Sequence, residues 1–156
     1  MNFPLVDELS GHASCLLHSN LILVFGGWDG KQYTNDVKVI DLDQRRISKA
    51  VLSEMEMEAA KQDDRVPLGR NGHTMTYVEN QGVFIFGGWD CTRLNNADQS
   101  FAIMWKLSPK WKFESCDIYI NTPCARRGHT TTLLNNGNLL IFGGIYGLGR
   151  FLNDLY

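Results

Sequence analysis

The sequence has no long hydrophobic run, and its apolar stretches are as short as those at residues 21–25 and 139–142. A membrane-spanning helix needs about 20 consecutive apolar residues, so no such helix is predicted. The first residues also lack the basic segment and the long apolar segment of a secretory signal. We therefore expect no membrane association.

Closely spaced cysteine pairs are missing too. The chain has four cysteines, Cys15, Cys91, Cys116 and Cys124, with no CxxC pair among them. This spacing does not fit a disulfide scaffold or a CxxC metal site. A reducing compartment, the cytosol or the nucleus, is the expected location.

The charge has no strong excess of one sign. With 15 basic and 17 acidic residues the net charge is -2, which provides no general attraction for nucleic acid or anionic membranes. An aromatic share of 11% and 15 glycines in 156 residues favour a turn-rich β protein, and the length favours a single domain with its own core.

One short phrase occurs three times. FGGWDG at 25–30 returns as FGGWDC at 86–91 and as FGGIYG at 142–147. A Gly-His pair precedes each phrase, and the His lies 14 residues before the first glycine in all three units. Such regular internal repetition indicates a repeat architecture.

Each 14-residue piece predicts a β-hairpin, because it holds two β-prone runs around a polar turn. The turns lie at 19–20, 79–82 and 135–138. The second runs, LILVF, VFIF and LLIF, are apolar without alternation, as expected for strands covered on both faces.

Two further strands are predicted after each double glycine. The third strands begin at Asp36, Phe101 and Asp154, and the fourth strands are RRISKAV and WKFESC. Four antiparallel strands in units of about 50 residues are typical of the blades of a β-propeller.

The chain resembles the kelch-repeat family at this point. The resemblance covers the double glycines, the Asn-Asp before the third strand, Trp111 at the fourth strand, and the complete motif P-x-x-R-x-G-H in VPLGRNGH and TPCARRGH. Unit one departs from the pattern, with Leu9 in place of the arginine and Ile47 near the position of the tryptophan. The resemblance implies an all-β, kelch-type β-propeller.

The units predict about two and a half four-stranded antiparallel blades. Blade one is expected at 1–52, an acidic linker at 53–66, blade two at 67–122, and blade three, truncated in its third strand, at 123–156. The linker is interpreted as a variable loop or as a short helix begun by a capping box at Ser53 and Glu56. Propellers close with four to eight blades, so we expect a piece of a larger propeller or a truncated gene product. Its remaining blades would come from a longer parent chain or from self-association.

The repeated positions are interpreted as scaffold. The glycines do not open a helix, so a phosphate-binding loop is not predicted, and the histidines are expected to be repeated structural groups rather than a metal cluster. These scaffold positions are His12, Gly26, Gly27, Arg70, His73, Gly87, Gly88, Trp111, Arg126, His129, Gly143 and Gly144.

Catalysis is not predicted. Some kelch-like propellers are copper radical oxidases, which keeps a metal-dependent oxidase as an alternative. The tyrosines and histidines here form no arrangement that matches such a site, and no catalytic triad stands in a recognisable context. No cofactor and no metal are expected.

A partner-binding face is predicted instead, where the loops after the double glycines meet the connections between blades. Trp, Tyr and Arg are the residues that most often dominate interfaces. The alternative is that Trp28 and Trp89 only cap the blade core. The predicted contact residues are Trp28, Asp29, Lys31, Trp89, Asp90, Arg93, Tyr146 and Arg150, with Tyr33 and Ile145 in the same loops.

Arginines at 70, 126 and 127 join Arg93 and Arg150 near this face and predict a basic sector for an acidic peptide. The predicted function is a protein-interaction scaffold or adaptor. The resemblance implies roles with ubiquitin ligases, small GTPases or the cytoskeleton, and the substrate-recognition part of a ubiquitin ligase complex is a second alternative.

Overall fold

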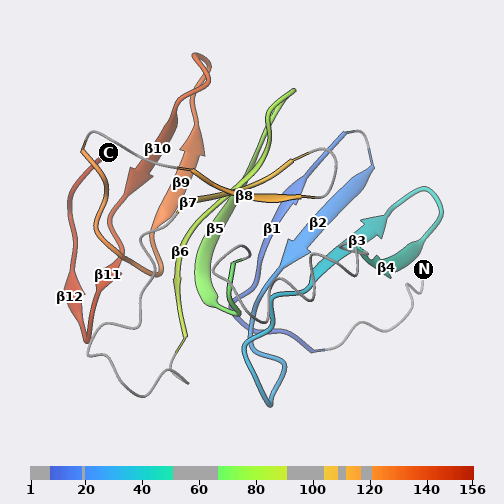
Figure 1. Cartoon of the computed structure of the whole chain (residues 1–156), viewed down its shortest axis with the longest axis horizontal. Coiled ribbons are helices and arrows are strands. Elements are labelled where there is room, and N and C mark those ends of the chain that lie inside the picture. The colour runs from blue at the N-terminus through green and yellow to red at the C-terminus, as the bar shows by residue number, and fades with distance from the viewer. Residues whose placement is uncertain (1–7, 19, 51–66, 91–103, 109–111, 117–120) are drawn as a thin grey trace.

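The computed structural model of the chain describes residues 8–18, 20–50, 67–90, 104–108, 112–116 and 121–156. Regular structure within these ranges consists of strands, as Figure 1 shows. No helix in the described part of the chain could cross a membrane. The acidic linker, with its alternative of a short helix, lies outside the described residues, as do Arg93 and Trp111.

Blade one is a four-stranded antiparallel sheet. Its strands β1 (Ala13–Leu16), β2 (Leu21–Phe25), β3 (Val37–Asp41) and β4 (Arg46–Lys49) pair in sequence order. β2 pairs with β1, β3 with β2 and β4 with β3, all antiparallel, so the sheet is a meander. All four strands of this unit match those predicted from the sequence.

Blade two repeats this arrangement. It comprises β5 (Asn71–Val78), β6 (Gly82–Trp89), β7 (Met104–Leu107) and β8 (Phe113–Cys116), again paired in sequence order. Asn80 has φ of 61° in the turn between β5 and β6, a conformation that asparagine tolerates better than most residues. The predicted all-β fold of four-stranded antiparallel blades is confirmed.

Blade three contains the hairpin of β9 (Thr130–Leu133) and β10 (Leu139–Phe142). A second, smaller hairpin of β11 (Ile145–Tyr146) and β12 (Arg150–Phe151) follows the double glycine. Leu155 forms an isolated bridge with Phe142 where a third strand would begin. The positions of the domain boundaries, including the truncation of blade three, remain predictions.

The apolar core lies between the sheets. Phe25 of blade one is fully buried among residues that include Met75, Ile85 and Trp105 of blade two. A smaller cluster of Phe86, Met104 and Ile141 joins blades two and three. The second strand of blade two therefore has apolar neighbours on both sides, as its unbroken apolar sequence predicted.

The first strands of successive blades lie side by side, β1 against β5 and β5 against β9 (Figure 1). A chain of backbone hydrogen bonds connects their beginnings. The N–H of Gly72 donates to the carbonyl of Gly11 at 2.9 Å, and the N–H of Gly128 donates to the carbonyl of Gly72 at 2.8 Å. The Gly-His pairs thus mark where one blade is attached to the next.

The double glycines form a second attachment between blades. The N–H of Gly27 donates to the carbonyl of Arg70 at 2.8 Å, and the N–H of Gly88 donates to the carbonyl of Arg126 at the same distance. The residue before each donor is Gly26 or Gly87. At both positions the next blade occupies the space where the Cβ of a larger residue would lie. A Cβ on Gly87 would lie 2.5 Å from both the Arg126 carbonyl oxygen and a carbon of the His129 ring. The glycines therefore serve the packing of blades.

This geometry predicts different costs for the same substitution in blades two and three. Gly87 and Gly143 have similar φ values, 70° and 65°, but a Cβ on Gly143 would meet no neighbour closer than 3.3 Å. We expect Gly143→Ala to cost about 1–2 kcal/mol, from its left-handed φ alone. Gly87→Ala should cost about 3–5 kcal/mol because it also drives the blades apart. Urea unfolding of the two variants measures the difference, and equal losses would contradict the packing role.

Candidate protein-interaction face

Two of the arginines predicted to form a basic sector are buried instead. Arg70 and Arg126 are almost completely inaccessible to solvent. Each guanidinium donates from Nη1 to the carbonyl of the first glycine of its own blade, Gly87 or Gly143, at 2.9 Å. The assignment of both to the scaffold fits these contacts, whereas their contribution to a basic sector on the surface is wrong.

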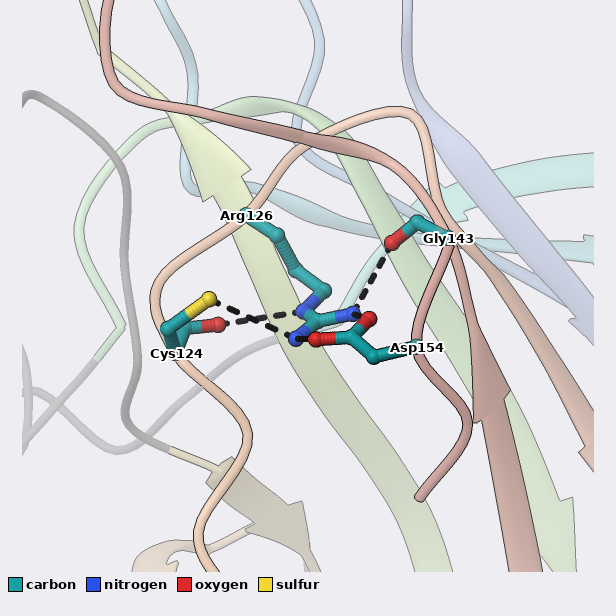
Figure 2. Close-up of polar contacts among 4 residues, drawn as sticks. All are labelled: Cys124, Arg126, Gly143 and Asp154. Carbon is teal, nitrogen blue, oxygen red and sulfur yellow. Dashed lines mark hydrogen bonds and ion pairs between the residues drawn. The ribbon is translucent and has the colours of Figure 1, made fainter. Parts of the chain in front are cut away.

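Arg126 lies at the centre of a polar cluster with Cys124, Gly143 and Asp154 (Figure 2). Its Nη1 and Nη2 donate to the two carboxylate oxygens of Asp154, at 2.6 and 3.0 Å, and its Nε donates to the carbonyl of Cys124 at 3.1 Å. The hydrogen bonds from Arg126 lower the pKa of Asp154. This fork-to-fork pair fixes the start of the third strand against the opening of the first.

Blade one lacks that arginine, and its aspartate finds another cation. Asp36 occupies the position of Asp154, and Leu9 occupies the position of Arg126. The carboxylate of Asp36 instead pairs with the ammonium group of Lys49 on β4. The departure of unit one from the repeat motif thus replaces a buried arginine with an exposed lysine as the partner of the aspartate.

The three repeated histidines lie at the openings of three separate blades. His12 is exposed, whereas His73 and His129 are buried. The rings of His73 and His129 lie edge-on to Phe25 and Phe86 of the preceding blade, with ring centroids 5.4 and 5.3 Å apart. Within the described ranges no group of three or more His, Cys, Asp or Glu side chains could hold a metal ion.

The two buried histidines differ in their hydrogen bonds. His129 Nε2 lies 2.9 Å from the hydroxyl of Thr74, which also contacts the hydroxyl of Thr131 at 2.7 Å. Neither ring nitrogen of His73 has a hydrogen-bond partner. The reason is in the preceding blade, where Ala13 occupies the position of Thr74. The interface between blades one and two therefore lacks the hydroxyl that serves the next interface.

The predicted loop face exists as a set of cross-strand pairs at one end of the sheets. Ser10 pairs with Trp28, Asn71 with Trp89, and Arg127 with Ile145. Each pair places the residue before a Gly-His pair beside the residue that follows the double glycine. The loops after the double glycines and the openings of the blades therefore share one end of the molecule, as the strand directions predicted.

Aromatic rings and one guanidinium connect the three blades across this end. The ring of Tyr33 lies 4.9 Å from that of Trp28 and 6.2 Å from that of Trp89, between ring centroids. The guanidinium of Arg127 lies over the Trp89 ring at 4.9 Å and donates to the carbonyl of Gly147 at 2.9 Å. We call Trp28, Tyr33, Trp89 and Arg127 the aromatic row. All four side chains are half-buried, so they pack together and still present surface.

Tyr33 and Trp89 occupy the central positions of the aromatic row, and Arg127 ends it over the Trp89 ring. The predicted contact residues did not include Tyr33 or Arg127, although Tyr33 was expected in the same loops. The recurring Trp after the double glycine was visible in the sequence. Tyr33 instead lies in a loop of variable length, and Arg127 was counted only as a charge. Their contacts with Trp89 follow from the packing of blades, which sequence spacing does not define.

The remaining predicted contact residues occupy different environments. Lys31 is exposed, and the Asp29 carboxylate accepts hydrogen bonds from the backbone N–H groups of Gln32 and Lys31, which lower its pKa. Asp29 therefore shapes its own loop. Asp90 is only 8% exposed, so its side chain offers little contact area. Tyr146 and Arg150 are exposed on the hairpin of β11 and β12.

That hairpin also presents apolar residues that the sequence analysis missed. Leu148 is 90% exposed and Phe151 is 83% exposed. Single exposed apolar residues are common, but two beside Tyr146 on one short hairpin form a prominent apolar tip. No pattern in the sequence distinguished them from buried residues.

A separate hollow lies at the opposite end of the sheets. A cavity of about 400 Å³ between blades one and two has mainly apolar walls, including Leu17, Leu23 and Val83. His18 and Tyr77 join the two blades beside it, with the tyrosine hydroxyl 3.0 Å from Nε2 of the histidine. The hollow is thus distinct from the aromatic row.

The buried histidines predict a loss of stability on acidification. Burial lowers the pKa of His73 to about 3, and burial, with the nearby charge of Arg126, lowers that of His129 to about 4. In the unfolded chain both histidines have a pKa near 6.5, so they bind a proton below that pH while the folded chain keeps them neutral. The free energy of unfolding should therefore be highest above pH 6.5 and fall steadily toward pH 4. Urea unfolding at several pH values tests this. His73→Phe should weaken the dependence, and an unchanged slope would contradict it.

The missing hydroxyl predicts a stabilising substitution. Ala13→Thr would place a hydroxyl where Thr74 stands in the next interface, within reach of the unpartnered His73 ring. A net gain of about 0.5–1.5 kcal/mol is expected for one new hydrogen bond to a buried group. Ala13→Val, which has a similar shape without the hydroxyl, is the matched control. A stabilisation of the same size in both variants would show that packing, not hydrogen bonding, caused it.

Comparisons with known proteins agree with this geometry. Residues 10–46 match the family model described as Kelch motif. Adagio-like protein 3 of Oryza sativa subsp. japonica is 28% identical over 137 residues, which cover 86% of this chain and 20% of that protein. Adagio protein 3 of Arabidopsis thaliana is 25% identical over 141 residues, which cover 90% of this chain and 21% of that protein.

A third relative, Adagio-like protein 1 of Oryza sativa subsp. japonica, is 23% identical over 135 residues, which cover 86% of this chain and 20% of that protein. The chain thus spans about one fifth of the length of the curated relatives it matches. The matched motif begins at Ser10, beside the first Gly-His pair, and runs through the first three strands of blade one to the start of the fourth. Residues 10–46 thus carry a kelch motif, and the four-stranded sheet of this unit recurs in unit two. The attachment between blades one and two recurs between blades two and three.

Proposed function

We propose that the chain is a protein-interaction module that binds a partner through its loop face. The observation that carries this proposal is the aromatic row, which runs continuously over three blades and remains half-exposed. Tyr and Trp side chains provide large contact areas at a low cost in conformational entropy, and Trp, Tyr and Arg are the residues that most often dominate protein interfaces. The kelch repeats support the same proposal, because their loops are free to differ while the strands stay constant.

A partner segment of acidic character fits the charges of this face. Lys31 and Arg150 are exposed on the loops of blades one and three, and Arg127 lies between them over Trp89. Two carboxylates lie nearby, of which Asp29 accepts hydrogen bonds from backbone N–H groups and Asp90 is buried. Paired with the apolar tip, these cations favour a peptide that combines carboxylates with at least one large apolar side chain.

Selection from a displayed peptide library against the chain tests the proposal. The recovered peptides should be enriched in Asp and Glu, and the double variant Lys31→Glu and Arg150→Glu should weaken their binding about tenfold, which is about 1.4 kcal/mol. The salt dependence of the affinity should also become smaller, since two charge pairs are lost.

Arg46→Glu is the matched control, because Arg46 is an exposed cation on the fourth strand of blade one, away from the loop face. It should leave the affinity unchanged. Circular dichroism and urea unfolding establish that each variant retains the fold. Equal affinity of the double variant and the control for the selected peptides would reject the acidic segment. A Trp89→Ala variant that folds and binds normally would reject the aromatic row as the site.

A further inference from the structure

The hollow between blades one and two has the size of a small-molecule site. Its volume is about 400 Å³, and ligand pockets typically measure about 300–1,000 Å³. A dry apolar cavity of about 150 Å³ already holds a benzene molecule. The hollow lies between two four-stranded sheets, so residues of both blades can contact one ligand.

The walls of the hollow are aliphatic and uncharged. They include Leu17, Leu21 and Leu23 of blade one and Val83 and Leu107 of blade two. Among the described residues that line the hollow there is no aspartate, glutamate, lysine or arginine. A charged ligand would lose its hydration there without gaining a partner of opposite charge. The wall chemistry therefore favours a neutral, mainly apolar molecule.

One polar pair lines the same hollow. The hydroxyl of Tyr77 lies 3.0 Å from Nε2 of His18, and the two rings meet edge to face with their centroids 5.1 Å apart. A tyrosine hydroxyl has one hydrogen to donate and an oxygen that accepts. In either tautomer of the histidine, the tyrosine hydroxyl therefore keeps one role open for a hydroxyl group of a ligand.

The frame of the hollow is formed before any ligand binds. The N–H of Leu17 donates to the carbonyl of Leu21 at 2.8 Å, which closes the turn of blade one. On the other side, Gly82 lets β6 approach the backbone of β7, because a Cβ at this position would collide with the carbonyl oxygen of Leu107. A site that is already formed loses little conformational entropy when it binds.

We propose that this hollow binds a neutral small molecule with an apolar body and one hydroxyl group. The apolar body would lie between Leu23 and Val83, where it removes aliphatic surface from water. The hydroxyl group would bond the hydroxyl of Tyr77. Because the hollow lies at the opposite end of the sheets from the aromatic row, this inference does not rest on the proposed function.

Fluorescence titration of the chain with naphthol tests the proposal, with naphthalene and naphthoate as matched probes. Naphthol should bind saturably with a dissociation constant below about 1 mM. Naphthalene lacks the hydroxyl and should bind about fivefold more weakly. Naphthoate should bind at least about tenfold more weakly, because its charge would be buried without a partner.

Tyr77→Phe tests the polar contact. This variant keeps the ring and removes the hydroxyl, so the preference for naphthol over naphthalene should disappear while the affinity for naphthalene stays the same. A tyrosine with a purely structural role would instead change both affinities together.

Leu23→Phe tests the location. Phe84 occupies the equivalent position in blade two, so the repeat accepts a phenylalanine there. The larger side chain should fill part of the hollow and lower the affinity for naphthol about tenfold, while urea unfolding shows that the fold is retained. Leu16→Phe is the matched control, because Leu16 is exposed and lies on the opposite side of its strand from Leu17. It should leave the affinity unchanged.

Several outcomes would overturn the inference. They are absent saturation by naphthol, equal affinity for naphthoate, an unchanged preference in Tyr77→Phe, and full affinity in Leu23→Phe. Competition between naphthol and the acidic peptides selected on the loop face would show that a peptide side chain fills the hollow. Dissociation of a dimer by naphthol in sedimentation velocity would assign the hollow to a second copy. Peptides that bind Leu23→Phe normally, while naphthol does not, would support two independent sites.

Discussion

The absence of a side chain at the first glycine of each FGG phrase is the constraint on which the blade arrangement depends. At Gly26 and Gly87 the next blade places a backbone carbonyl and a histidine ring within 2.8 Å of where a Cβ would be. Any larger residue would have to displace backbone as well as side chain. Because the positive φ of these glycines also favours glycine, sterics and conformation require the same residue. The phrase therefore repeats because the approach of the blades repeats, and no ligand is needed to explain it.

The buried arginines complete this attachment from within each blade. Arg70 and Arg126 donate to the carbonyl of the first glycine, so they hold the backbone of the glycine against which the next blade packs. Burying a guanidinium is costly unless its donors are satisfied. Carbonyls satisfy part of this requirement, and Asp154 satisfies more of it in blade three. Blade one has Leu9 in place of the arginine, so it neither buries a guanidinium nor gains its hydrogen bond to the glycine carbonyl. Its aspartate, Asp36, pairs instead with Lys49 on the fourth strand.

The sequence was sufficient to predict the parts of the structure that every blade shares. Hairpins, strand order and the scaffold role of Gly87 or Arg126 follow from local spacing and from the fixed distance of 14 residues in each unit. The candidate face was only partly predictable, because it depends on contacts between blades. Trp28 and Trp89 were found from their repeated place, but Tyr33 joins them from a loop whose length varies. The burial of Asp90 and the exposure of Leu148 and Phe151 were also invisible, since a residue's surroundings in a loop have no periodic signal in the sequence.

The same division between shared and variable parts explains why the two tryptophans have both structural and surface roles. Trp28 and Trp89 come directly after the shared FGG geometry, and each is held in place by pairing with the residue before a Gly-His pair and by packing against the Tyr33 ring. Such fixed side chains lose little further freedom when a partner binds. The loop residues beyond them, such as Lys31, differ from blade to blade. An interface built on this face would therefore derive its rigidity from the repeat and its specificity from the loops.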